Sequence, residues 1–169
     1  MRRDDPGAVR STSGTANKCF VPGLLTLLDV SDEKELERAS NRYKEEMKKV
    51  QEVLAQSPEK MARFFSTSRP LLQENKQILT AMRQEHDADA IRLMFINAHT
   101  IKGGARTLSM KALAEALHTM ETYYVELLHS EAAIDRQRLL QEYEDADAVF
   151  EDYRRINRDK LNRETDFTN

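Results

Sequence analysis

The chain has 169 residues, of which 40% are hydrophobic and 33% charged, with 5 glycines, 4 prolines and no tryptophan. This composition is typical of a soluble helical protein with one domain and some appendages. A net charge of −3 offers no basic surface for nucleic acid, and the apolar runs are too short for membrane insertion. The first residues do not resemble a secretory signal. The single cysteine, Cys19, excludes an internal disulfide and is compatible with the cytoplasm, where we expect the protein to reside.

Residues 1–31 are expected to form a flexible tail or linker, because glycine, serine and threonine dominate its start. It ends in a short apolar docking piece, Phe20 to Asp29, which Pro22-Gly23 interrupts. An accessory helix is predicted at 32–56. Its apolar residues alternate three and four positions apart and form a narrow seam: Leu36, Ala39, Tyr43, Met47, Val50 and Leu54. We expect this seam to pack across the end of a bundle or to pair with its copy in a homodimer.

Apolar residues with a period near 3.6 predict four further helices at 59–84, 87–108, 110–129 and 133–160. Short connections between them predict an all-α, up-down four-helix bundle over residues 57–160, with the accessory helix as an addition and residues 161–169 as a C-terminal tail. Pro70 lies inside the first of the four helices. We expect a kinked but continuous helix there, since the apolar period keeps its phase, rather than a new helix capped by Ser68.

The helix predicted at 87–108 carries a histidine at the edge of its apolar stripe. With Ala98 at the centre of the stripe, His99 lies about 100° round, and Lys102 follows one turn later. Gly103 and Gly104 sit in mid-helix, where each costs about 1 kcal/mol relative to alanine. A bare surface beside a boundary histidine and an ammonium group favours a histidine that carries a phosphoryl group and presents it to a partner. The alternative is a half-buried structural histidine.

The sequence His99-Thr-Ile-Lys-Gly-Gly-Ala, after an apolar turn, resembles the signature of histidine-containing phosphotransfer (HPt) domains. The subtype that it most resembles is the one at the front of chemotaxis histidine kinases, where a second helix carries a histidine and a glutamate one turn apart. Here that helix has His118-Thr-Met-Glu121. The resemblance covers roughly residues 59–160. It implies that His99 is phosphorylated and that Lys102, His118 and Glu121 surround it.

Helix geometry allows Glu121 to meet His99. Helices joined by a short turn run antiparallel, and His99 and Glu121 lie about ten and eleven residues from that turn, so their heights differ by about 2 Å and the side chains can meet if their flanks are on the same side. A carboxylate at the inner ring nitrogen would fix the tautomer and strengthen the nucleophile. Lys102 would neutralise the phosphoryl oxygens or, alternatively, lie along the bundle surface. His118 would support Glu121 or be a bystander, and Glu121 itself has the alternative of merely covering a helix edge.

Two positions depart from the family pattern. Ser109 stands where the family usually has a glycine, and we expect it to cap the next helix. Arg106 replaces a small residue on the flank of His99 and either aids an acidic partner or obstructs it. Together with Gly103 and Gly104, it forms the expected docking surface.

The resemblance implies a phosphorelay module that takes a phosphoryl group from a histidine kinase or receiver domain and passes it to a receiver aspartate. No phosphate-binding loop is present, so we expect no enzymatic activity and no cofactor; the chain is either a stand-alone relay or a piece of a chemotaxis-type kinase. A purely structural adaptor is one rival. A metal-binding bundle is another, because Glu115 and His118, and Glu126 and His129, form Glu-x-x-His pairs, but both pairs lie on one helix, and we expect no metal.

Overall fold

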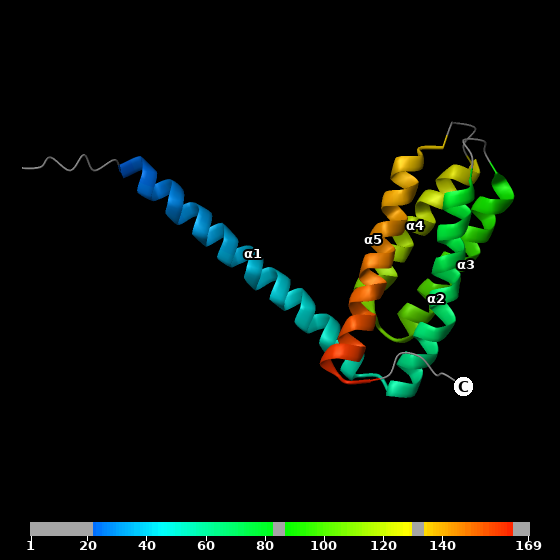
Figure 1. Cartoon of the computed structure of the whole chain (residues 1–169), viewed down its shortest axis with the longest axis horizontal. Helices are drawn as coiled ribbons and strands as arrows, with labels where there is room; N and C mark the ends of the chain where they lie inside the picture. The colour runs from blue at the N-terminus through cyan, green and yellow to red at the C-terminus, as the bar shows by residue number, and fades with distance from the viewer. Residues whose placement is uncertain (1–21, 83–86, 130–133, 164–169) are drawn as a thin grey trace, which may run out of the picture. The chain divides into compact units, whose positions relative to one another are not determined.

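The computed structural model describes residues 22–82, 87–129 and 134–163, and over these ranges it contains helices and no strand (Figure 1). The helices are α1 (Pro22–Leu54), α2 (Pro58–Ala81), α3 (Ala88–Thr107), α4 (Lys111–His129) and α5 (Arg136–Arg155), followed by a π-helical turn, η1 (Ile156–Lys160). Helices α2 to α5 each contact the next, and α5 closes the ring on α2. The predicted all-α bundle with an additional N-terminal helix is confirmed.

The bundle core is built from apolar side chains at helical spacing. On α3 the stripe is at most 1% exposed throughout, and it comprises Ile91, Met94, Ala98, Ile101 and Ala105. The facing stripes of α4 and α5 are equally buried and comprise Leu113, Leu117, Met120, Tyr124, Leu139, Ala146 and Phe150. Because these stripes pack closely against one another, the flanks of α3 and α4 have fixed positions relative to each other.

Three helix starts are set by side-chain caps. Ser57, Asp87 and Asp135 precede α2, α3 and α5, and each accepts a hydrogen bond from the backbone N–H three residues later, at 3.0–3.3 Å. Asp135 explains why α5 begins at Arg136 and not at 133, as the sequence analysis predicted. Helix α2 runs through Pro70 without interruption, so the predicted continuous helix is confirmed.

Helix α1 begins at Pro22, ten residues before the predicted accessory helix, and so includes much of the expected linker and docking piece. Proline is tolerated in a first helical turn, where its missing N–H would have no partner, and the leucines that follow it are good helix formers. The rest of the expected tail, residues 1–21, lies outside the described residues. The chain divides into two parts, residues 1–41 and 42–169, and the last turns of α1 belong to the second.

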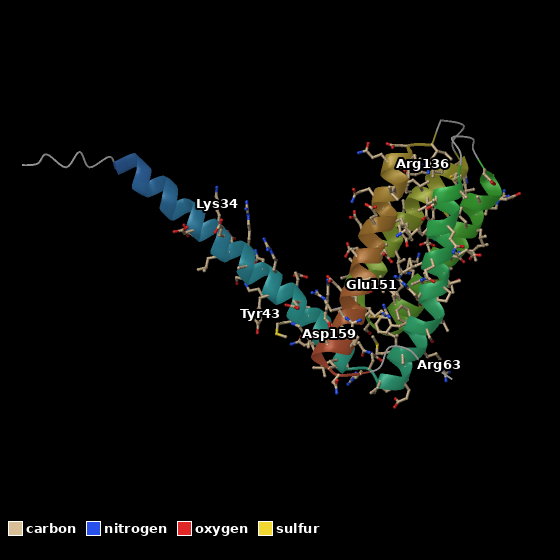
Figure 2. The ribbon with its side chains drawn as sticks, viewed as in Figure 1. Lys34, Tyr43, Arg63, Arg136, Glu151 and Asp159 are labelled. Atoms are coloured by element: carbon tan, nitrogen blue, oxygen red, sulfur yellow. The ribbon has the colours of Figure 1, made fainter. Side chains whose placement is uncertain are left out.

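The last turns of α1 pack against the bundle through only part of the predicted seam. Met47 and Val50 of the seam pack against the core, together with Val53, which is 0% exposed, whereas Leu54 is 52% exposed. Arg163 donates hydrogen bonds to the carbonyls of Val53 and Gln56, which holds the end of this helix. Tyr43, also expected in the seam, projects from the helix and is 65% exposed (Figure 2).

The turn between α3 and α4 depends on a residue in a left-handed conformation. Ser109 has a φ of 57°, and the flanking amides bond back into α3, Ser109 N to Arg106 O at 3.0 Å and Met110 N to Ala105 O at 2.9 Å. This is a Schellman ending of α3. The prediction that Ser109 caps the next helix is therefore wrong: the amide of Lys111 instead donates to a carboxylate oxygen of Glu52, at 3.3 Å.

Within the described residues, no helix has the length and hydrophobicity that crossing a bilayer requires.

Candidate functional site

His99 is held at the boundary between core and solvent by the α3 stripe. Its neighbours Ala98 and Ile101 are at most 1% exposed, while the His99 side chain is 65% exposed. A helix rotates by about 100° per residue, so anchoring Ala98 in the core turns the next side chain to the flank. The predicted boundary position of His99 is confirmed.

Glu121 of α4 meets the inner nitrogen of this imidazole. The distance between His99 Nδ1 and Glu121 Oε1 is 2.6 Å, and Glu121 is 6% exposed. An ionised carboxylate only accepts hydrogen bonds, so Nδ1 carries the proton and the lone pair of the neutral ring lies on Nε2. The pairing predicted from helix heights is present.

Lys102 lies on the other side of the same carboxylate. Its Nζ donates to Glu121 Oε2, and the lysine is 7% exposed, so it does not lie along the surface. Burial, and secondarily the charge of Arg106, lower the pKa of the Lys102 ammonium. The adjoining Glu121 carboxylate opposes this shift, because an adjacent anion favours the charged form of a lysine. The ammonium that we assigned to phosphoryl oxygens is thus bonded to Glu121 beneath the histidine.

His118 lies one helical turn before Glu121 and is exposed. Its Nδ1 is 3.9 Å from Glu121 Oε2, which is too long for a hydrogen bond, and its side chain is 61% exposed. The structure therefore brings His118 to the site without bonding it there.

The two mid-helix glycines have different surroundings. A Cβ added at Gly103 would meet no atom within 4 Å, so the surface beside His99 is open there. A Cβ added at Gly104 would lie 2.8 Å from the ring of Phe64 in α2, so this glycine allows close packing. Both glycines are predicted on the docking surface, but Gly104 is half-buried and faces Phe64 of α2, so its place there is a packing position. Arg106 is exposed.

The sequence analysis missed two features of α3. Asn97 is 4% exposed and donates to Asn75 Oδ1 at 2.9 Å, while Asn75 donates to the Met94 carbonyl at 3.1 Å, which links α2 to α3 behind the histidine. Phe95 is half-buried, and its ring stacks on the His99 imidazole. Asparagines at apolar-stripe positions could have predicted the link between α2 and α3. The i, i+4 spacing of two rings could have predicted the stack on His99.

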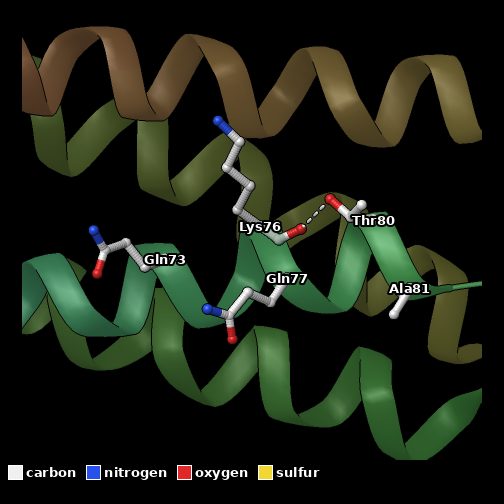
Figure 3. A pocket seen from close by; sticks show the side chains of 5 residues that line it. All are labelled: Gln73, Lys76, Gln77, Thr80 and Ala81. Atoms are coloured by element: carbon white, nitrogen blue, oxygen red, sulfur yellow. Dashed lines mark hydrogen bonds between the residues drawn. The ribbon is translucent and has the colours of Figure 1, made fainter.

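Other parts of the structure offer less chemistry. No group of three histidine, cysteine, aspartate or glutamate side chains placed to hold a metal ion occurs in the described part of the chain. An open hollow on α2 is lined by Gln73, Lys76, Gln77, Thr80 and Ala81 (Figure 3). Thr80 donates to the backbone carbonyl of Lys76 there, and none of these residues belongs to the cluster around His99.

The cluster of His99, Glu121 and Lys102 lies within a segment that matches a known family. The family model for the Hpt domain matches residues 68–149, which include all of α3 and α4. No curated protein and no solved structure matches the chain. Residues 68–149 therefore match the Hpt domain family, whose members are histidine phosphotransfer modules of phosphorelays.

Proposed function

We propose that His99 is the phosphorylated residue of this Hpt domain and that Glu121 orients and activates it. The observation that carries the proposal is the bond between His99 Nδ1 and Glu121 in a side chain that is otherwise 65% exposed. This arrangement protonates the inner nitrogen and leaves Nε2 free for attack at the surface. A structural histidine would not need an exposed, unprotonated nitrogen.

In the transfer step the phosphoryl group moves from the donor to His99. Nε2 attacks the phosphorus of the donor, the new N–P bond forms as the bond to the leaving group breaks, and the ring becomes an imidazolium. Nδ1 keeps its proton and its hydrogen bond to Glu121, whose negative charge stabilises the cation. Lys102 neutralises and fixes Glu121 from below, a positioning role in place of direct contact with the phosphoryl group. His118, whose Nδ1 is 3.9 Å from Glu121 Oε2, has a supporting role beside that carboxylate.

We infer that the partners are a receiver domain and the ATP-binding domain of a histidine kinase, in the cytoplasm, and that the module belongs either to a relay of its own or to a chemotaxis-type kinase. The open surface at Gly103 and the exposed Arg106 form the docking area in this proposal. Arg106 would attract the acidic residues of a receiver site.

The test of the function is phosphoryl acceptance by the whole chain. Incubation with phosphoramidate, followed by mass spectrometry, should add one acid-labile phosphoryl group. His99→Gln should abolish this addition, while His118→Gln and His129→Gln should retain it. Undiminished labelling of His99→Gln would overturn the assignment.

The docking surface has its own test. Gly103→Leu should leave phosphoramidate labelling and the fold intact, because the position is open, but should block transfer to a receiver domain that accepts phosphate from the wild type. The measurement is the transfer rate by gel autoradiography. Equal rates for Gly103→Leu and wild type would remove Gly103 from the interface.

A second proposal concerns α1. Leu36 and Tyr43 are 76% and 65% exposed at heptad spacing, which favours pairing with the same helix of another copy. Light scattering should show a dimer for the whole chain and a monomer for Leu36→Glu/Tyr43→Glu. An unchanged mass would count against pairing through this helix.

A further inference from the structure

We propose that Phe95 is a positioning residue for phosphoryl transfer: its ring stacks on the His99 imidazole and fixes the plane of that ring, so that the free Nε2 faces the partner in one orientation. The proposal rests on the assignment of His99 made above.

The two rings form an offset stack. Their centroids are 5.9 Å apart and their planes differ by 22°, within the range of favourable aromatic pairs. The pair is i, i+4 on α3, and helical side chains lean toward the helix N-terminus. The imidazole of His99 therefore lies over the preceding turn, where Phe95 is.

Phe95 is suited to act as a platform because it is itself anchored. It is half-buried and packs against the buried core cluster, whereas His99 is 65% exposed. An exposed histidine has a broad torsion at its ring, and a single hydrogen bond tolerates tens of degrees of rotation. The bond to Glu121 fixes the position of Nδ1, and the stack restricts rocking of the ring about that bond.

Ring orientation matters only when the donor or acceptor is itself oriented. Transfer between His99 and a receiver aspartate needs nitrogen, phosphorus and oxygen in line, and a misplacement of about 1 Å can slow such a step by about 10²-fold. Phosphoramidate, by contrast, is free to approach Nε2 from any direction. Loss of the stack should therefore slow protein-to-protein transfer and spare labelling by the small molecule.

The first experiment measures ring order directly in the unphosphorylated chain. In histidine-labelled protein, carbon relaxation should give a lower order parameter for the His99 ring in Phe95→Leu than in wild type. Phe95→Tyr should restore it, and Val149→Ala, which trims a half-buried side chain of α5, should leave it unchanged. His118 and His129 in the same sample are internal references. An unchanged His99 order parameter in Phe95→Leu would overturn the proposal.

The second experiment measures the consequence. Phosphoramidate should label Phe95→Leu within about twofold of the wild-type rate, while transfer to a receiver domain that accepts phosphate from wild type should fall about tenfold and recover in Phe95→Tyr. Equal losses in both reactions would show that Phe95 acts through the nucleophile or the fold and would overturn the proposal. Failure of phosphoramidate to label wild-type His99 would instead refute the proposed function, leaving the ring-order result to stand alone.

Discussion

Two glutamates each join helices through one carboxylate, and they differ in how exposed the side chains bonded to that carboxylate are. In the relay cluster, Glu121 binds Lys102 and the ring of His99. In the junction cluster, Glu52 of α1 accepts from the Tyr153 hydroxyl of α5 and from the backbone N–H of Lys111 at the start of α4. The partner that matters in the relay cluster is 65% exposed, whereas Tyr153 is 0% exposed.

This difference gives the two clusters different chemistry. His99 connects Glu121 to an exposed imidazole, and in the function proposed above a phosphoryl donor would reach its Nε2. Tyr153 ends inside the protein: burial, and then its hydrogen bond to Glu52, raise the pKa of its hydroxyl, so it stays protonated. The two carboxylates thus differ in their side-chain partners: Glu121 is bonded to an exposed imidazole, and Glu52 to a buried hydroxyl.

The largest expected contrast comes from neutralising each carboxylate. Glu121→Gln should slow labelling by phosphoramidate by about 10²–10⁴-fold, because an orienting base contributes that much and an amide cannot stabilise the imidazolium. Glu52→Gln should leave the labelling rate unchanged and lower the free energy of unfolding by about 1 kcal/mol, since it weakens two hydrogen bonds. The measurements are initial labelling rates and urea denaturation. Equal rates for the two variants would erase the distinction between the clusters.

The next contrast removes a lysine from each region. Lys102→Met leaves Glu121 buried without its counter-charge, which should lower the free energy of unfolding by about 3 kcal/mol and slow labelling. Lys49→Met breaks the 2.9 Å pair with Asp152 beside Tyr153, and because Asp152 is 41% exposed we expect about 1 kcal/mol or less. Denaturation of both variants under the same conditions compares them. A larger loss of unfolding free energy for Lys49→Met than for Lys102→Met would mean that the junction lysine contributes more to stability.

Much of the relay cluster could be predicted from the sequence, because helical periodicity fixes the face of each residue. The stripe through Ala98 placed His99 on the flank, and the short turn to α4 placed Glu121 at the same height. Periodicity does not say how deep a flexible side chain lies. Lys102 was therefore expected near the phosphoryl group, and only the structure shows it beneath Glu121.

Contacts between distant segments were beyond the sequence. Nothing in the spacing around Glu52 indicates that it bonds the first amide of α4, because that contact depends on how α1 packs on the bundle. The two adjacent glycines likewise look alike in sequence, and only the position of the Phe64 ring distinguishes Gly104 from Gly103. The spacing of apolar residues predicts the helices, whereas the contacts of each side chain depend on how the helices pack.

Alkaline pH should weaken the junction cluster through Tyr153. The pKa of Tyr153 in the folded protein is raised above its unfolded value of about 10. Its contribution to stability is therefore fully present below about pH 10 and is lost as the pH rises beyond that value, because the unfolded tyrosine ionises first. Tyr153→Phe should show a shallower loss of the free energy of unfolding between about pH 9 and 11 than wild type, measured by urea denaturation. Parallel pH curves would mean that Tyr153 is not shielded at the junction.

The smallest expected effect concerns Ser109, which leads from α3 into the α4 amide that Glu52 accepts. Its φ of 57° places a side-chain-bearing residue in the left-handed region, at a cost of about 1 kcal/mol relative to glycine. Ser109→Gly should therefore raise the free energy of unfolding by about 0.5–1 kcal/mol, with no change in the labelling of His99. Asn162, with a φ of 49°, is the matched control, because asparagine tolerates this conformation and Asn162→Gly should gain less. A faster labelling rate in Ser109→Gly would instead show that strain in this turn reaches the relay cluster, and the two carboxylate clusters would then be coupled through α4.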